Sequence, residues 1–153
     1  NILAVQGNLA ITYRLLGRVE LSMRMRKDIY FGWLNLKGED NHNTIREANN
    51  YATILVDDLW RFEEARSLMR KMMPVAQRVL GESDGITLRM RMNYALALCN
   101  DPASTLDDLR EAVATLEDTA RTARRVFGGA HPLTTGIEVE LRKARAALCA
   151  REE

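Results

Sequence analysis

Asparagine recurs at steps of 42 and 43 residues along the chain, as Asn8, Asn50 and Asn93. A side-chain amide can donate and accept a hydrogen bond at once, which suits the backbone of an extended peptide. Arg46 and Arg89 each lie four residues before one of these asparagines, so a helix places them on the same face. Because guanidinium binds carboxylate through two parallel bonds, the series predicts a surface for an acidic peptide.

Both features also have a simpler interpretation. The asparagines would only tie neighbouring helices together, and the arginines would be solvated charges beside Glu47 and Glu140. Asparagine has poor propensity in the middle of a helix, so its recurrence there needs some reason. Methionine at helical spacing is more often core than pocket. The flanking cations and remaining contacts of the candidate site are Arg14, Lys143, Thr53, Met92 and Leu96.

No other residue type gathers into a reactive pattern. His42 and His131 are the only histidines, and neither has neighbours at metal-ligand spacing. Cys99 and Cys149 are too few for a disulfide framework and have no base nearby in sequence. Phosphate-binding glycine loops and hydrolase signatures are missing as well. We therefore expect no catalytic residue, no metal and no cofactor, and a protein that is not an enzyme.

The composition limits the function classes further. The 153 residues are 46% hydrophobic with a net charge of +1, which is ordinary for a folded domain and gives no field for phosphate backbones. Charged residues interrupt every apolar run, so no segment reaches the roughly 20 residues that a membrane span needs. We expect neither nucleic acid nor a membrane as partner. The cysteine usage favours an intracellular, cytoplasmic location.

Each of these asparagines begins a triplet that ends in alanine, namely Asn8-Leu9-Ala10, Asn50-Tyr51-Ala52 and Asn93-Tyr94-Ala95. The triplets belong to a longer repeat, and a helical sequence should be searched for repeats first. A glycine break follows each triplet, and a threonine lies six residues after each break. The breaks are Gly38, Gly81 and Gly128, and the threonines are Thr44, Thr87 and Thr134. Glycine suits the left-handed position that ends a helix. The pattern predicts seven helices, near 1–16, 18–36, 43–58, 61–80, 85–99, 105–127 and 132–150.

Two of these helices carry apolar stripes at steps of three and four, as an amphipathic helix requires. The stripes are Phe62, Ala65, Met69, Met72, Ala76 and Val79, and then Leu109, Ala112, Leu116, Thr119, Ala123 and Val126. The extra length between them lies in 100–108, where turn and cap residues predict a loop insertion. Trp60 stands where a turn glycine is lost, and we expect its ring to fill the hole. Trp33 reads as core or inter-repeat packing.

The pattern resembles the 42-residue tetratricopeptide repeat of kinesin light chains and their relatives. Motif positions match across the chain, at Asn8-Leu9-Ala10, Tyr13, Gly17-Arg18, Arg61-Phe62-Glu63-Glu64-Ala65, Val79-Leu80-Gly81, Asn93, Glu111-Ala112 and His131-Pro132. The resemblance implies an all-α, right-handed α-solenoid of antiparallel helix pairs, with about 3.5 repeats. It also implies that the first helix of each pair lines a concave groove, where Asn8, Asn50 and Asn93 hydrogen-bond a bound peptide.

We expect one domain over 1–153, with repeats at about 1–40, 41–83 and 84–130, a terminal helix at 131–150, and a longer parent protein. The predicted function is that of an adaptor or scaffold, which binds a protein or peptide in the groove. The alternative is a structural subunit or linker that uses its convex face and ends in a larger assembly. A regulatory domain of a multidomain protein, and the oligomeric state, stay open.

Overall fold

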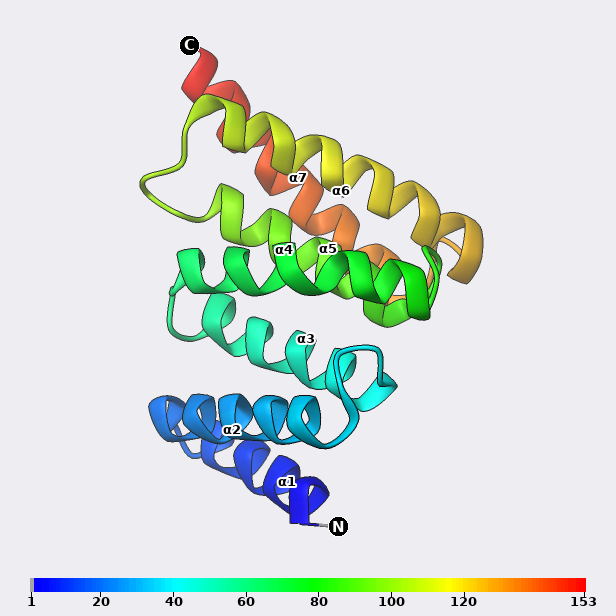
Figure 1. Cartoon of the computed structure of the whole chain (residues 1–153). Helices are drawn as coiled ribbons and strands as arrows, with labels where there is room; N and C mark the ends of the chain where they lie inside the picture. The colour runs from blue at the N-terminus through cyan, green and yellow to red at the C-terminus, as the bar shows by residue number, and fades with distance from the viewer. Residues whose placement is uncertain (1) are drawn as a thin grey trace.

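The computed structural model describes residues 2–153, and across that range the chain forms seven α-helices and no strand. They are α1 (Ile2–Leu15), α2 (Val19–Lys37), α3 (His42–Asp57), α4 (Phe62–Val79), α5 (Gly85–Cys99), α6 (Leu106–Phe127) and α7 (Pro132–Glu152). Each helix packs on the next, and α3–α5 and α5–α7 also pack on one another. The result is a stack of helical hairpins with the termini at opposite ends (Figure 1). The predicted all-α solenoid is confirmed.

The predicted helix boundaries agree with the structure to within two residues, and side-chain caps mark the starts of four helices, α3, α5, α6 and α7. Asn41 accepts a hydrogen bond from the Asn43 backbone N–H at 2.9 Å, and Asp84 caps α5 in the same way at 2.8 Å. Thr105 and Asp108 form a reciprocal capping box at the start of α6. These caps satisfy backbone donors that have no partner inside the helix, so the chain enters α3, α5 and α6 at fixed residues.

Glycine ends the longer helices as the sequence predicts. Gly38, Gly81 and Gly128 follow α2, α4 and α6 with φ between 79° and 95°. A side chain at these angles would be strained, which glycine avoids. The α1–α2 turn uses Gly17 in the same way, at φ 78°. The matching α3–α4 turn instead has Trp60 at φ 54°, the one non-glycine residue of the described chain with positive φ.

The two apolar stripes of α4 and α6 face the core. Every member of the two predicted sets is buried except the last residue of each, Val79 and Val126, which lie beside the terminating turns. The helix α4 continues without interruption through Pro74, which is exposed. Burial of this kind is the main force that holds a solenoid together, since one hairpin cannot cover its own apolar face.

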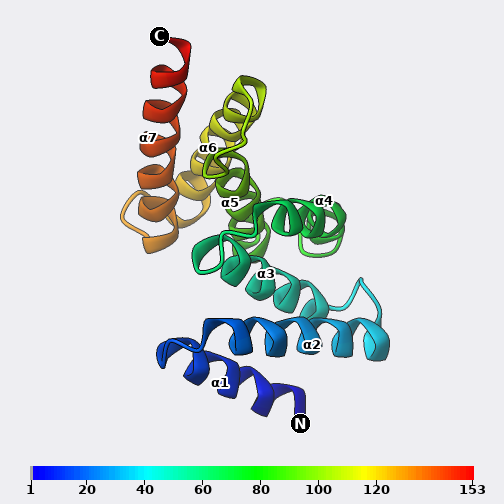
Figure 2. The ribbon, with the colours of Figure 1, turned by 90° about the vertical axis from the view of Figure 1, so that its left-hand side faces the viewer.

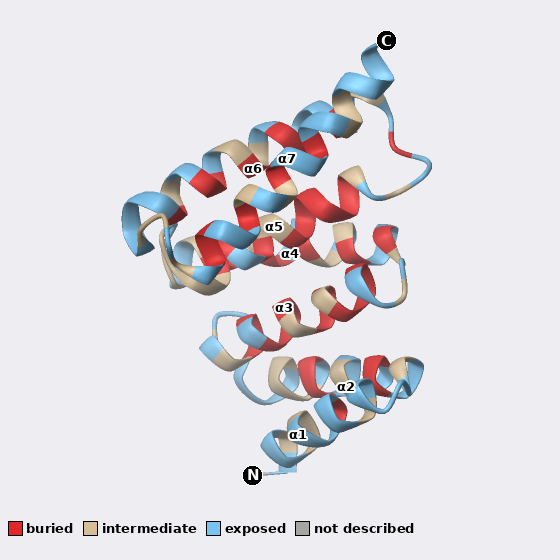
Figure 3. Ribbon diagram, turned by 180° about the vertical axis from the view of Figure 1, so that it is seen from behind, coloured by how far each residue is buried: buried red, intermediate tan, exposed pale blue. Residues whose placement is uncertain are grey.

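Burial is uneven along the stack. In α3 and α5 most residues are buried, whereas in the described part of α1 only Ala10 is (Figure 3). A second view shows α1 and α2 at one end, with α6 and α7 at the other and α3 to α5 between them (Figure 2). The core therefore lies in the middle and C-terminal hairpins, and the first hairpin contributes little to it.

Candidate functional site

The eight predicted binding residues all lie on the first helices of the pairs, α1, α3 and α5. They line a row of three hollows, of about 340, 390 and 280 Å³. Asn50 belongs to the first two hollows and Thr53 to the last two, so the row is continuous. The structure thus places these residues along one concave path, although it does not bring all of them to one point.

The first hollow lies between α1 and α3 and contains Asn8, Arg46 and Asn50. Glu47 is the centre of its polar contacts. The Arg46 Nε lies 3.6 Å from the Glu47 carboxylate, and the Asn50 Nδ2 donates to the same carboxylate at 3.4 Å. Arg26 of α2 approaches it at 3.2 Å. The predicted cation Arg46 is therefore partly neutralised, whereas the side chain of Asn8 is exposed.

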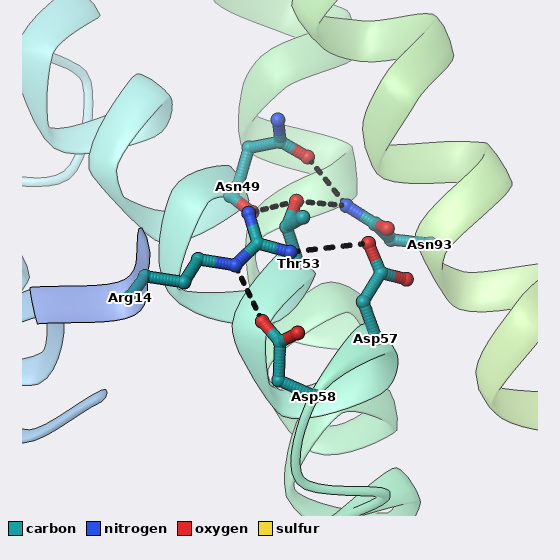
Figure 4. A network of polar contacts seen from close by, with 6 residues as sticks. All are labelled: Arg14, Asn49, Thr53, Asp57, Asp58 and Asn93. Carbon is teal, nitrogen blue, oxygen red and sulfur yellow. Dashed lines mark hydrogen bonds and ion pairs between the residues drawn. The ribbon is translucent and has the colours of Figure 1, made fainter. Parts of the chain in front are cut away.

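Asn93 lies deeper, between α3 and α5, and is 3% exposed. Its Nδ2 donates to the Asn49 Oδ1 at 2.9 Å and to the Thr53 Oγ1 at 3.0 Å. Thr53 in turn donates its hydroxyl to the Asn49 backbone carbonyl at 2.9 Å. Figure 4 shows this network spanning the two helices. Both amide hydrogens of Asn93 are thereby used inside the protein.

One acceptor atom and one donor atom of this network form no hydrogen bond with a described residue. The Oδ1 of Asn93 and the Nδ2 of Asn49 bond no other described residue, and neither is among the enclosed unpartnered atoms (Figure 4). The two unused atoms point away from each other, and of the two residues only Asn93 lines a hollow of the concave path (Figure 4). The Asn93 Oδ1 can still accept a hydrogen bond. The network can therefore tie two helices together and still offer a hydrogen bond to a ligand.

The third hollow lies between α5 and α7 and contains Arg89, Met92 and Leu96 together with Asn93. Within residues 2–153, Arg89 forms no ion pair, so its guanidinium is available. The carboxylates of Asp57 and Glu140 line the same hollow. The surroundings of Arg89 are consequently of mixed charge, and an acidic ligand stays a prediction.

The outer cations of the predicted series have partners. Arg14 reaches across from α1 and its Nε lies 2.6 Å from the Asp58 Oδ2, while its Nη2 lies 3.9 Å from Asp57 (Figure 4). Lys143 lies 3.3 Å from Glu140. Partial loss of water raises the pKa of the Asp57 carboxyl, Arg14 opposes the rise, and the charges of Asp58 and Glu140 add to it. Negative charge thus accumulates where α3 ends.

Sequence reasoning missed Asn49 as a site residue. The repeat marker points to Asn50, yet its neighbour Asn49 is the one that pairs with Asn93. A signal was present, because Asn49 lies four residues before Thr53 and thus on the face that α3 turns toward α5. Two successive asparagines allow one to face the core while the other faces the groove.

The remaining candidates carry structural roles or none. The Nδ1 of His131 accepts a hydrogen bond from the Leu133 N–H at 3.0 Å and so caps α7. Cys99 is partly buried and Cys149 is exposed. In residues 2–153 no group of three or more metal-ligating side chains is found. None of the helices in this range is long and apolar enough to cross a membrane.

The prediction for Trp60 is wrong. Its side chain does not fill the turn but is 75% exposed, because a left-handed backbone at this residue directs the ring away from the helix pair. Trp33 is half-buried and lines the first hollow, beside α1 and α3. Its predicted role in the core or in packing between repeats stays a prediction.

Comparison with known proteins agrees with this geometry for part of the chain. The family model of the tetratricopeptide repeat matches residues 48–84, which cover most of α3, all of α4 and the turn that follows. No curated protein sequence matches the chain. The likeness to kinesin light chains in particular stays a prediction. Residues 48–84 therefore form a tetratricopeptide repeat within an all-α helical solenoid of that type.

Proposed function

We propose that the chain is a protein-binding scaffold that holds an extended peptide segment along α1, α3 and α5. Tetratricopeptide repeats in general mediate protein–protein interaction, and they are generally non-enzymatic. The observation that carries the proposal is the continuous row of hollows, whose wall includes Asn93 with an Oδ1 that bonds no described residue. Buried polar groups of this kind give specificity when a ligand satisfies them.

The ligand would lie across the hollows rather than inside one of them. Hollows of 280 to 390 Å³ each accommodate a few side chains, and their shared residues Asn50 and Thr53 join them. Asn50 can turn its amide toward a peptide at little cost, since within residues 2–153 the 3.4 Å contact with Glu47 is the only hydrogen bond of its side chain. Met92 and Leu96 supply the apolar surface of the third hollow.

The test separates binding from folding. Peptides selected from a random display library on the intact chain are retested on Asn50→Ala and Asn93→Ala, with Asn35→Ala on the exposed side of α2 as matched control. We expect Asn50→Ala to weaken binding about tenfold without changing the melting temperature. Asn93→Ala should lower both affinity and stability, because it leaves Asn49 and Thr53 without their donor. Peptides that bind both variants as tightly as the control variant would contradict the proposal.

The charge of the ligand is tested in the same assay. Arg46→Glu combined with Arg89→Glu should weaken an acidic peptide more than a neutral one, and less so at high salt. The control is Arg24→Glu, on an exposed residue of α2. If the selected peptides contain no excess of Asp and Glu, the proposed preference for acidic ligands is wrong. The proposal that the groove binds a peptide would not be affected.

One observation favours the alternative, a subunit of a larger assembly. Ile2, Val5 and Leu16 of the first hairpin are exposed by 65 to 76%. An apolar surface of this kind marks an interaction site when it is contiguous. Light scattering at rising concentration measures self-association, and Val5→Lys should abolish it if this face forms the interface.

A further inference from the structure

The two places where the repeat pattern fails lie side by side. The α3–α4 turn has Trp60 in place of glycine, and the loop before α6 carries an insertion. Both contribute to one hollow of about 960 Å³, more than twice the 390 Å³ of the concave hollow beside Asn50. Its walls come from the end of α3, the start of α4 and the residues Asn100, Asp101 and Pro102. This hollow lies at the edge of the solenoid, at the turns within the pairs.

Trp60 gives this hollow an aromatic surface that the fold itself does not use. The side chain is 75% exposed and its backbone has φ 54°, where Gly17 of the equivalent α1–α2 turn has φ 78°. A left-handed conformation is strained for a residue with a side chain but not for glycine. Burial does not offset that strain here. The indole is therefore free to pack against a ligand.

The charge around the indole is negative. The carboxylates of Asp57, Glu63, Glu64 and Asp101 line the hollow, against the single guanidinium of Arg61. That guanidinium is held by Glu64 at 2.6 Å and by Glu20 at 3.4 Å.

Behind the wall, the largely buried Arg66 pairs with Glu63 and, at 3.2 Å, with Asp101. It fixes both carboxylates in place at the edge of the hollow. The Asp57 carboxylate keeps only the distant 3.9 Å contact with Arg14.

Three of the four carboxylates, those of Asp57, Glu63 and Glu64, are exposed to solvent beside the indole, whereas Asp101 is largely covered. The four carboxylates outnumber the two guanidiniums of Arg61 and Arg66, so a net negative charge remains at this edge.

We propose that this edge hollow is a second docking surface, which takes an arginine- or lysine-bearing segment of a partner protein. The cation stacks on the Trp60 indole, and the surrounding carboxylates meet its charge. Tryptophan is the aromatic residue that attracts cations most strongly, and a carboxylate rim excludes acidic segments by repulsion. Asp57 lines both this hollow and the third hollow of the concave path, so the edge surface adjoins that path at the end of α3.

The probe is a fluorescein-labelled nonapeptide of alternating arginine and glycine, and the matching glutamate–glycine peptide is the negative control. Binding is followed by fluorescence anisotropy and by tryptophan emission. Trp60→Gly should weaken the arginine peptide about tenfold and remove the emission change. Because glycine relieves the left-handed backbone, the melting temperature should stay or rise. Loss of binding in this variant can thus not come from unfolding.

A second pair of variants tests the charge. Glu64→Gln with Asp101→Asn keeps the shape and the side-chain acceptors, and it should weaken the arginine peptide several-fold at low salt. The matched control is Glu39→Gln with Glu82→Gln, two exposed carboxylates in turns at the opposite ends of the helices. It should leave binding unchanged.

Three outcomes would overturn the edge site. They are no binding of the arginine peptide at 1 mM, equal binding by Trp60→Gly and the unmodified chain, and equal effects of the two carboxylate pairs. A peptide that responds only to Asn50→Ala lies in the concave path instead. That result would end this proposal while leaving the proposed function intact, so the two can fail separately.

Discussion

Two neighbouring junctions of the solenoid are built differently. At the junction of α3 with α5 the helices pack directly, and Asn93 bonds Asn49 and Thr53 inside it. At the junction of α1 with α3, no two Cα atoms of the described residues, one from each helix, come within 8 Å of each other. Hollows of about 340 and 390 Å³ lie there, and Arg14 spans the space to Asp58 at 2.6 Å. One junction is closed by packing, and the other is open and spanned by charge.

The difference separates stability from binding capacity. In a solenoid each repeat is stabilised only by its neighbours, so the free energy of unfolding follows the quality of each junction. The closed junction buries its polar groups and fixes the Asn93 amide. The open junction leaves Asn8 and Asn50 accessible and gives the first hairpin little apolar burial. We infer that α1 is the first element to unfold and also the wall of the groove that can move most.

The largest expected effect compares a buried leucine at the closed junction with an exposed leucine at the open one. Leu88 of α5 is fully buried, whereas Leu9 of α1 is exposed. Leu88→Ala should lower the free energy of unfolding by about 2–5 kcal/mol, because it leaves a cavity in a packed core. Leu9→Ala should cost less than about 1 kcal/mol. Urea unfolding measures both. Equal losses would mean that the first hairpin is as tightly packed as the middle of the stack.

The next largest expected effect is a difference in the rates at which the two cysteines react with a thiol reagent. Burial at the end of α5 raises the pKa of the Cys99 thiol to about 11, and the Glu140 carboxylate adds to the rise. Since the thiolate is the reactive form, Cys99 at pH 8 should have a thiolate fraction roughly a hundredfold below that of an unperturbed thiol. Exposed Cys149 should therefore react first with a thiol reagent.

This reactivity also sharpens the comparison of the junctions. Leu88→Ala loosens the packing around α5 and should speed the labelling of Cys99. Leu9→Ala should leave it slow. A Cys99 thiol that reacts as fast as Cys149 in the unmodified chain would show that the closed junction opens often.

The fold could be predicted closely because its signals are local. Gly38, Gly81 and Gly128 end helices for reasons of backbone geometry, and Asn41 and Asp84 start them by capping. Such signals act within a few residues and need no knowledge of the tertiary structure. For the same reason the helix boundaries and the two apolar stripes were found correctly.

The site was less predictable because it depends on which face each side chain turns to. The repeat marker favours Asn50 and gives no sign that Asn49 bonds Asn93, since that contact joins residues 44 positions apart. It also cannot show that Arg14 meets Asp58, a carboxylate 44 positions away, although Glu47 beside Arg46 could be read from the sequence. The prediction for Trp60 was wrong for a further reason. Its backbone has a positive φ, which sequence patterns normally assign to glycine.

A smaller effect tests the charges that span the open junction. Arg14→Ala removes the contacts with Asp58 and Asp57, which are partly exposed to solvent. We expect a loss of about 0.2–1 kcal/mol that shrinks at high salt. Hydrogen exchange should become faster in α1 and stay unchanged in α5. The control is Arg121→Ala, whose partner Asp118 lies on the same helix. Faster exchange throughout the chain would contradict a local role.

The smallest expected effect concerns the repeat threonines. Thr44 and Thr87 occupy the same place in the first turns of α3 and α5, and both are fully buried. The Thr44 Oγ1 has no hydrogen-bond partner within residues 2–153, whereas the Thr87 Oγ1 donates to the Ala76 carbonyl at 3.4 Å. An unpaired buried hydroxyl costs free energy, and valine replaces it with a methyl group of the same shape.

Thr44→Val should therefore raise the free energy of unfolding by a few tenths to about 1 kcal/mol, while Thr87→Val should be neutral or slightly destabilising. Thermal melts of the two variants give the difference directly. Helix propensity cancels, because valine and threonine are nearly equal in a helix and the positions are equivalent. If Thr44→Val lowers stability more than Thr87→Val, the Thr44 hydroxyl must bond a group at the α2–α3 junction. The repeat threonine would then act as a polar tie on the open side of the stack as well.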